Sequence, residues 1–580
     1  MFLRIHNDRG VERLYICQSR RVGSSVKSEN VKSLGRIDKL TQEMNMSRDQ
    51  VIEWARSQVD DMKEDSDSSV IQIPFSSETP IDMNEQRSFL AGYLFPQSIY
   101  YDLRMKNVMR NIRSRYKYEF DLDAIFSDLI YARILEPGSK LSSYSTSKKF
   151  LEPPKYELHD VYRALSVLAK EMDYILAETY KNSHFVVKRN NRILYYDCTN
   201  YFFEIEEEDK IRKYGKSKEH RPNPIVQMGL FMDGDGIPLT FDLFDGSSNE
   251  QPSLKPLEQK IIRNFGFEKF VVCTDGGLGS DDNRQFNDIE GRAFICTQSL
   301  KKLKKKDRES AMNERNWKRL SDQKPVNIDE IKDNPSLYQN ELYYKEDVYG
   351  TQKVPGQRMI VTYSPKYALY QKKIRESQLE RASEMVSSRN AKKSRKNPND
   401  PARFVKVINT TEDGEVAEDK TFLIDEEKVK AEEMYDGFYA ICTDLVEDDV
   451  QDILTVSEGR WEIEESFRIM KTEFRSRPVY LSREDRIKAH FLTCYMALLI
   501  FRIMEKKTGC TFTAPNLIHT LRDYRLLKLK DYGYIPEYKR TEVTDKLHEV
   551  FGFRTDTEIV PPSTVRNIIS NSKKISSPTT

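Results

Sequence analysis

The sequence predicts a multi-domain α/β protein built around a mixed β-sheet that is flanked by helices. The chain has 580 residues, several times the ~150 residues of an average domain. Short apolar runs bounded by Gly, Pro, Asn and Asp lie between residues 190 and 300 and are typical of strands. Longer stretches with the helical spacing of apolar residues precede and follow them.

Residues 1–185 are expected to begin with mixed structure and then to be largely helical. Residues 47–65, 122–135 and 160–180 have helical spacing, with Ser47 as a candidate N-cap of the first helix. Turn-rich EPGSK and EPPK segments separate the later patterns. Short helices joined by such turns are typical of helix-turn-helix DNA-binding modules, and equally of other helical bundles.

The next part of the chain has the pattern of a sheet. Strands are predicted at residues 192–198, 225–233, 238–244, 270–274 and 292–297, and a helix at 253–265. The Asp-Gly-Asp-Gly sequence at 233–236 is a hairpin signal, so the second and third strands should be antiparallel neighbours. This order of strands and helices predicts a mixed sheet with helices on its faces.

Residues 301–455 are highly charged and contain further strand-like pieces. These pieces lie at 342–348, 358–363 and 437–443, and a long basic helix is predicted around 366–396. Helices return at 457–475 and 485–506.

The formal net charge of +1 conceals an uneven distribution of charge. Residues 412–452 carry 16 acidic and 3 basic residues, so the rest of the chain is basic. Basic clusters lie at 104–117, 301–306 and 389–396. One such cluster is typical of a solvated face, but three in one chain favour a polyanionic partner. We expect the acidic stretch to pack away from that partner or against a basic cluster.

Several protein classes are not expected. The most apolar stretch, 491–501, is about half the length of a bilayer span, and the N-terminal sequence MFLRIHNDRG has no apolar signal core. Seven Cys without a C-x-x-C pair argue against a disulfide scaffold and fit a reducing cytosol. The full G-x-x-x-x-G-K-[ST] signature of a nucleotide-binding loop is absent, since Gly215-Lys216-Ser217 has Lys210 where the signature requires Gly. We therefore expect a cytoplasmic protein without a membrane partner or a nucleotide cofactor.

Two carboxylates follow equivalent apolar runs. Asp197 ends the predicted strand in YYDCT, and Asp275 ends another in VVCTDGG. A single Asp at such a place more often caps a turn or helix. Two of them at one sheet edge indicate a magnesium site, because Mg²⁺ needs few protein oxygen ligands. The seven His are scattered, which does not favour a softer metal.

A third carboxylate, Glu464, lies within a cationic stripe on a predicted helix. At 100° per residue, Arg460, Arg468 and Lys471 all fall within about 40° of Glu464. A salt-bridged surface helix would explain the pairs at i±4. The excess of cations instead favours a site that holds both a metal-binding acid and a phosphate backbone.

These segments resemble the DDE transposases of bacterial insertion sequences. The resemblance is to the group with a Tyr-x2-Arg-x3-Glu-x6-Lys signature, which Arg460, Glu464 and Lys471 match. Ser457 stands at the position of the signature's Tyr, so hairpin formation and other ways of processing the DNA ends stay open. The segments YYDCTNYFFE, RKYGKSK, QMGLFMDGDGIPL and VVCTDGGL are also similar to the family, so the likeness covers about residues 190–500.

The resemblance implies a ribonuclease-H-like mixed sheet flanked by helices and interrupted by a strand-rich insertion. On this basis we expect five regions, listed in chain order: an N-terminal DNA-binding region (1–185), the first part of the catalytic core (186–300), the insertion with its basic helix (301–455), the rest of the core (456–510) and a helical C-terminal region (511–580).

The resemblance also implies a function. The protein would bind the ends of its insertion sequence and carry out metal-dependent phosphodiester cleavage and strand transfer. Asp197, Asp275 and Glu464 would hold two Mg²⁺ ions, with Mn²⁺ as the alternative. The implied phosphate contacts are Arg460, Lys471, Arg468, Lys216 and Lys218.

The implied partners are double-stranded DNA, comprising the terminal inverted repeats and the target, and a second copy of the chain in a homodimer on DNA. The protein would be cytoplasmic and would associate with the nucleoid when bound to DNA. Two alternatives stay open: a metal-dependent DNA nuclease on the same fold without strand transfer, and a DNA-binding derivative without catalysis.

Overall fold

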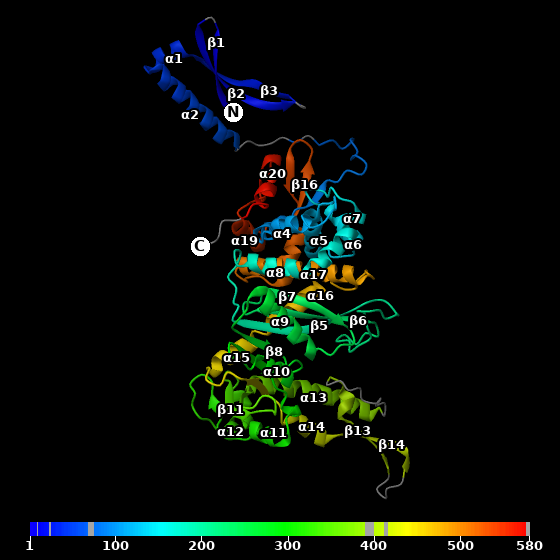
Figure 1. Cartoon of the computed structure of the whole chain (residues 1–580). Coiled ribbons are helices and arrows are strands. Elements are labelled where there is room, and N and C mark those ends of the chain that lie inside the picture. Colours follow the sequence, from blue (N-terminus) through cyan, green and yellow to red (C-terminus); the bar gives the residue numbers. More distant parts are fainter. Residues whose placement is uncertain are drawn as a thin grey trace. The chain divides into compact units, whose positions relative to one another are not determined.

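The computed structural model describes all residues except 9, 23–24, 68–72, 74, 389–398, 411–415 and 576–580. The chain forms two compact units, Met1–Glu85 and Gln86–Thr580 (Figure 1). This division falls well before the boundary that we expected near residue 185. The reason is that the helices after residue 90 bury their apolar faces in the same core as the central sheet.

The first unit is an antiparallel sheet packed on two helices. Its elements are β1 (Phe2–Asp8), β2 (Val11–Val22), β3 (Ser25–Arg36), α1 (Ile37–Met44) and α2 (Arg48–Asp67). Alternate residues of β2, including Leu14 and Ile16, are buried, and Leu14 packs with Leu40 and Val51 of the helices. The helix predicted at 47–65 is confirmed as α2.

The second unit is built on a nine-stranded mixed sheet with the order β10-β11-β12-β15-β9-β8-β5-β6-β7. In chain order, its strands are β5 (Ile193–Phe202), β6 (Ile225–Asp233), β7 (Pro238–Asp245), β8 (Phe270–Thr274), β9 (Arg292–Thr297), β10 (Lys318–Arg319), β11 (Tyr343–Tyr349), β12 (Gln357–Tyr363) and β15 (Phe438–Thr443). β8 pairs in parallel with β5 and β9, and all other neighbours are antiparallel. The predicted hairpin at 233–236 joins β6 to β7, as expected.

The strands after residue 301 continue this sheet. β15 pairs with β9, and the side chains of β9, β11, β12 and β15 share one apolar cluster. The region that we expected as an insertion therefore adds strands to the edge of the central sheet.

Helices cover both faces of the sheet around β5. Odd-numbered residues of β5, such as Tyr195 and Tyr201, pack with α16 (Trp461–Thr472) and α17 (Glu484–Lys507). Even-numbered residues, such as Leu194 and Tyr196, pack on the other face with α9 (Leu254–Phe265). This alternation follows from the two-residue period of a strand.

Helix α17 is the centre of the helical layer. It packs against α3 (Leu94–Asp102), α5 (Leu122–Leu135) and α7 (Leu158–Lys170). Figure 1 shows α5 and α7 in cyan and α17 in orange. The apolar stretch that we expected to be too short for a bilayer lies inside this longer helix. By length and composition alone α17 could cross a membrane, but 94% of its apolar window is buried inside the protein.

The remaining elements complete the unit. The helices are α4 (Met105–Arg113), α6 (Lys140–Ser147), α8 (Met172–Ser183), α10 (Asp281–Asn287), α11 (Lys305–Met312), α12 (Ile328–Asp333), α13 (Pro365–Ser387), α14 (Glu426–Glu433), α15 (Val450–Glu458), α18 (Ala514–Asp523), α19 (Glu542–Phe551) and α20 (Pro562–Asn571). Short 3₁₀ helices span Gln251–Ser253, Leu300–Lys302, Pro335–Leu337 and Pro401–Phe404. Strands β4 (Ser88–Leu90), β16 (Arg525–Leu529) and β17 (Gly533–Pro536) form a small sheet, and β13 (Val405–Thr410) pairs with β14 (Val416–Ile424).

Three of the predicted helices differ from those observed. The helix expected at 160–180 is broken at Glu171 into α7 and α8. The helix expected at 457–475 is α15 followed by α16, with the break at Gly459. The basic helix expected at 366–396 is α13, which ends at Ser387; the basic cluster at 389–396 lies outside the described residues.

The acidic stretch contacts one of the basic clusters. Lys301 lies over the ring of Tyr435, 5.1 Å from its centroid, and Asp436 beside it pairs with Arg375 at 2.5 Å. Burial raises the pKa of Asp436, while Arg375 and Lys301 oppose this rise. This part of the stretch is therefore neutralised by cations of the second unit.

Substitution of Asp128 in α5 should change stability in a pH-dependent way. Burial raises the pKa of Asp128 to about 7, although its carboxylate accepts a hydrogen bond from the Tyr156 hydroxyl at 2.8 Å. Because the unfolded carboxyl titrates near 4, the folded state loses stability as pH rises from about 4 to 7. Asp128→Asn should therefore raise the free energy of unfolding at pH 8 by up to about 4 kcal/mol, the equivalent of about three pKa units, and with it the melting temperature, and should change both little at pH 4. An equal shift at both pH values would contradict this explanation.

Candidate active site

The structure places Asp197 and Asp275 side by side on adjacent parallel strands. In the register of β5 and β8, Tyr196 lies opposite Thr274, so the two aspartates are the next residues along the two chains. Neighbouring strands are about 4.8 Å apart. Asp197 lies within β5, which continues to Phe202, so our expectation that it ends its strand is wrong. The strand that ends here is β8.

Helix α16 lies along β5 on the face that carries Asp197. Just before it, near the end of α15, the Val456 carbonyl accepts a hydrogen bond from the Tyr195 hydroxyl at 3.0 Å. A Cβ at Gly459 would lie 2.2 Å from the Tyr195 hydroxyl oxygen, so this approach requires glycine. At its end, Lys471 Nζ donates to Thr199 Oγ1 at 2.7 Å. These two contacts fix the helix over the strand.

Glu464 lies between these two contacts. Glu464 is five residues after Gly459 in the chain, and Asp197 is two residues after Tyr195. At the rise per residue of a helix and of a strand, each acid is about 7 Å beyond the place where Tyr195 approaches Gly459. The Glu464 carboxylate is 60% exposed and lies 3.5 Å from Arg460 Nη1. Asp197, Asp275 and Glu464 are all described residues, and they do not bring one oxygen each within 4.8 Å of one another. The third acid thus lies on the helix that contacts β5, and its carboxylate is paired with Arg460.

The electrostatics of the site centre on Asp197. Burial raises its pKa to about 6; the negative charge of Asp275 adds to this rise, and the positive charges of Lys218 and Arg460 oppose it. Burial opposes the charged form of Lys218, but Asp197 and Glu250 outweigh burial and raise the pKa of this lysine. Burial, together with the charge of Lys218, lowers the pKa of Lys471 to about 8. The site therefore brings charges of both signs together in a partly buried place.

The predicted cations are distributed unevenly. Lys218 Nζ donates to the Cys198 carbonyl beside Asp197, and Arg460 and Lys471 lie at the two ends of α16. Arg468 instead forms a bidentate ion pair with Glu465, with N···O distances of 2.7 and 2.5 Å. Lys216 is exposed in the loop after β5.

Other residues at this site were not found from the sequence. Glu250 pairs with Lys218 at 3.2 Å, and Glu219 pairs with Lys471 at 3.5 Å and with Arg477. Ser457, at the position of the signature's Tyr, is buried at the end of α15. No spacing rule relates positions so far apart in the chain, so the sequence carried no signal for these pairs.

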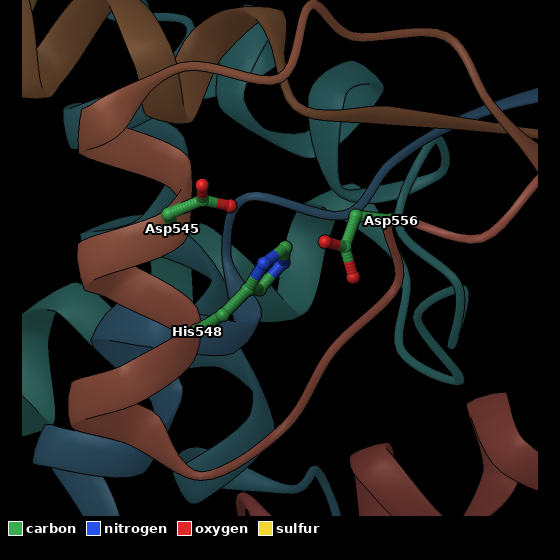
Figure 2. Close-up of side chains that lie close together, drawn as sticks. All are labelled: Asp545, His548 and Asp556. Atoms are coloured by element: carbon green, nitrogen blue, oxygen red, sulfur yellow. The ribbon is translucent and has the colours of Figure 1, made fainter.

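A second group of candidate metal ligands lies elsewhere in the same unit. Asp545 and His548 of α19 and Asp556 of the following loop bring their ligand atoms within 4.8 Å of one another, and Figure 2 shows the imidazole between the two carboxylates. Arg540 forms ion pairs with both carboxylates, at 2.8 and 3.5 Å, and Arg554 pairs with them as well, at 3.4 and 2.5 Å. The two arginines balance the two acids, so this cluster is compensated without a metal.

Comparisons with known proteins identify the class. Residues 199–500 match the family model described as the transposase DDE domain, which is more than half of the chain, and the chain belongs to this family. The match includes Asp275 and Glu464 and begins two residues after Asp197. Residues 3–72 match the N-terminal domain of IS1634 family transposases, so the protein is the DDE transposase of a bacterial insertion sequence.

Two further comparisons complete this result. No curated protein shows significant similarity to the chain. Among solved structures, the chain is similar to a piggyBac transposase in a synaptic complex with hairpin DNA, with 9% identity, a TM-score of 0.36 and coverage of 83% of this chain and 84% of that one.

The family defines the activity. The protein is a DNA transposase, an enzyme that cleaves DNA and transfers strands with the help of divalent cations. A nuclease without strand transfer and a non-catalytic derivative were the alternatives left by the sequence, and the family match favours neither.

Proposed function

We propose that Asp197, Asp275 and Glu464 are the catalytic acids of this transposase. The observation that carries the proposal is the adjacency of Asp197 and Asp275 beneath α16, the helix that presents Glu464. The two aspartates come from distant parts of the chain and lie side by side, and the helix that carries Glu464 packs on β5 beside them. Such convergence has no evident structural purpose, because burial opposes the ionised form of Asp197.

We also propose that the core is ribonuclease-H-like. Five neighbouring strands support this, in the order β7-β6-β5-β8-β9. The pairs β7–β6 and β6–β5 are antiparallel, and the pairs β5–β8 and β8–β9 are parallel. In this proposal 186–300 and 456–510 form the core, and 301–455 is the insertion. Residues 1–185 bind DNA, and 511–580 form a C-terminal region.

The donor set fits divalent ions. Asp275 Oδ1 accepts N–H bonds from Gly277 and Leu278 at 3.0 Å, which fixes the orientation of its carboxylate. Hard carboxylate oxygens suit Mg²⁺ or Mn²⁺, and rotation of Glu464 away from Arg460 would complete the set. Two such ions, when bound, would activate a water and later a DNA 3′-hydroxyl for in-line attack on a phosphodiester.

The surrounding cations have a separate role in this proposal. Arg460, Lys471 and Lys218 would bind the phosphate backbone next to the acids and neutralise charge that develops on the phosphoryl oxygens. Arg468 and Lys216 would contact the backbone further out. Joining two element ends requires two active sites, so we propose a homodimer on the terminal inverted repeats and the target. Its place of action would be the cytoplasm, on nucleoid DNA.

Metal-directed cleavage of the polypeptide tests the site without DNA. Full-length protein loaded with Fe²⁺ and treated with ascorbate and peroxide should be cut near residues 197, 275 and 464, and Mg²⁺ should suppress the cuts. Glu464→Gln should weaken them, whereas the neighbouring Glu465→Gln should not. Cuts confined to residues 545–556 would instead place the ions at the second cluster and overturn the assignment.

A further inference from the structure

A group of cations surrounds the end of β5, a few residues beyond Asp197. Lys471 lies over the ring of Tyr201, 5.5 Å from its centroid, and donates to Thr199. The guanidinium groups of Arg221 and Arg477 lie over the ring of Phe202, at 4.9 and 5.5 Å from its centroid. Three cations, one from the loop after β5 and two from residues 471–477, therefore lie at the two aromatic rings that end this strand.

A single carboxylate bridges two of these cations. Glu219 Oε1 lies 3.5 Å from Lys471 Nζ, and the same carboxylate pairs with Arg477. The side chains of Glu219, Lys471 and Arg477 are 24%, 15% and 23% exposed, so this network is largely withdrawn from water. Lys218 is compensated separately, by Glu250 and Asp197. Lys471 and Arg477 thus share the single carboxylate of Glu219.

The network has an excess of positive charge that costs free energy. Burial, followed by the charge of Lys218, lowers the pKa of Lys471, and burial also lowers the pKa of Arg477. Partly buried cations in excess of their partners are stabilised by a further anion. Guanidinium and ammonium groups that converge in this way suit a phosphate, whose oxygens can accept from several donors at once.

We propose that Arg221, Lys471 and Arg477 form a binding site for a DNA phosphate, and that the Glu219 carboxylate occupies this site in the DNA-free protein. This inference rests on the proposed active site, because it places the bound phosphate beside Asp197. A DNA phosphate displaces Glu219 when the duplex binds. Glu219 thereby lowers the affinity for DNA in general and acts as a positioning residue for Lys471 and Arg477.

The loop can release Glu219 without unfolding. Ser217 Oγ accepts from the backbone N–H groups of Glu219 and Arg221, at 3.3 and 3.2 Å. The Asn200 side chain donates from Nδ2 to the Lys216 carbonyl at 3.1 Å, and its Oδ1 accepts from the Lys218 N–H at 3.2 Å. These bonds fix the loop backbone, so only rotation of the Glu219 side chain is required.

Displacement of Glu219 by a DNA phosphate can be tested by DNA binding. The measurement is the affinity of full-length protein for a labelled terminal-repeat duplex, in EDTA to prevent cleavage. Glu219→Gln keeps the shape and removes the charge, so it should tighten binding about fivefold at ~50 mM salt and less at ~200 mM, where charges are screened. Glu178→Gln is the matched control, since it makes the same charge change in a pair with Lys181 on α8. It should leave the affinity unchanged.

A double-substitution cycle separates displacement from a general charge effect. Arg477→Gln and Arg221→Gln should each weaken binding, and Glu219→Gln should gain little in the Arg477→Gln background. An equal gain in both backgrounds, or no gain in the wild-type background, would overturn the proposal. If Arg477→Gln lowers the melting temperature, Arg221→Gln serves in its place, because Arg221 is exposed. These measurements involve neither metal nor cleavage, so their failure is distinct from failure of the three-acid assignment.

Discussion

Asp197→Asn, Asp275→Asn and Glu464→Gln should each reduce the rate of DNA cleavage by about 10³-fold or more. Each change removes a metal-binding carboxylate while preserving its shape. Loss of about 4 kcal/mol of transition-state stabilisation corresponds to this factor. The measurement is the cleavage rate of a labelled duplex that bears the element's terminal inverted repeats, in Mg²⁺ and in Mn²⁺.

Loss of folding would not explain such a result. Burial already favours the neutral form of Asp197, so Asp197→Asn should leave the melting temperature at pH 7 unchanged or slightly higher. Glu465→Gln and Asp242→Asn are matched controls, an acid on the same helix and one on β7, and should cleave within a few-fold of the wild type. Wild-type rates for all three acid variants would show that the site lies elsewhere.

Asp233→Ala should destabilise the second unit by about 3–5 kcal/mol, the cost of leaving a buried charge without its partner. Arg189 and Asp233 form an ion pair in which both side chains are fully buried. Arg189 also donates to Ser183 Oγ at 2.7 Å and to the carbonyls of Ile237 and Pro238 at 3.2 and 3.0 Å. Asp233 Oδ1 accepts from the N–H groups of Asp235 and Ile237. The pair therefore fixes the β6–β7 hairpin.

The measurement is the shift in the urea and thermal midpoints of full-length protein. Asp173→Ala is the control, because Asp173 is 63% exposed in its pair with Lys260 and should cost less than about 1 kcal/mol. The double variant Arg189→Met, Asp233→Leu should recover part of the loss, since it leaves no unpaired charge. A midpoint shift of Asp233→Ala no larger than the control's would contradict this role for the buried pair.

The regular elements around the site could be predicted closely from the sequence. The strands at 225–233, 270–274 and 292–297 are observed with the predicted bounds, because short apolar runs between turn residues leave few alternatives. Glu464 was singled out from its cationic helical stripe and a signature spacing, which are both local properties of the sequence. The break at Gly459 was not predictable, because it depends on the approach of Tyr195 from another segment.

The sequence by itself determined the class of the protein, the strands at 225–233, 270–274 and 292–297 and the three acids to be tested, because helical and strand periodicity and a local signature are properties of neighbouring residues. Only the tertiary structure decided that Asp197 lies inside its strand, that β15 joins the later strands to the central sheet, and that Glu219 lies between Lys471 and Arg477. These features depend on contacts between residues tens to hundreds of positions apart, and such contacts are set by packing and burial rather than by local pattern.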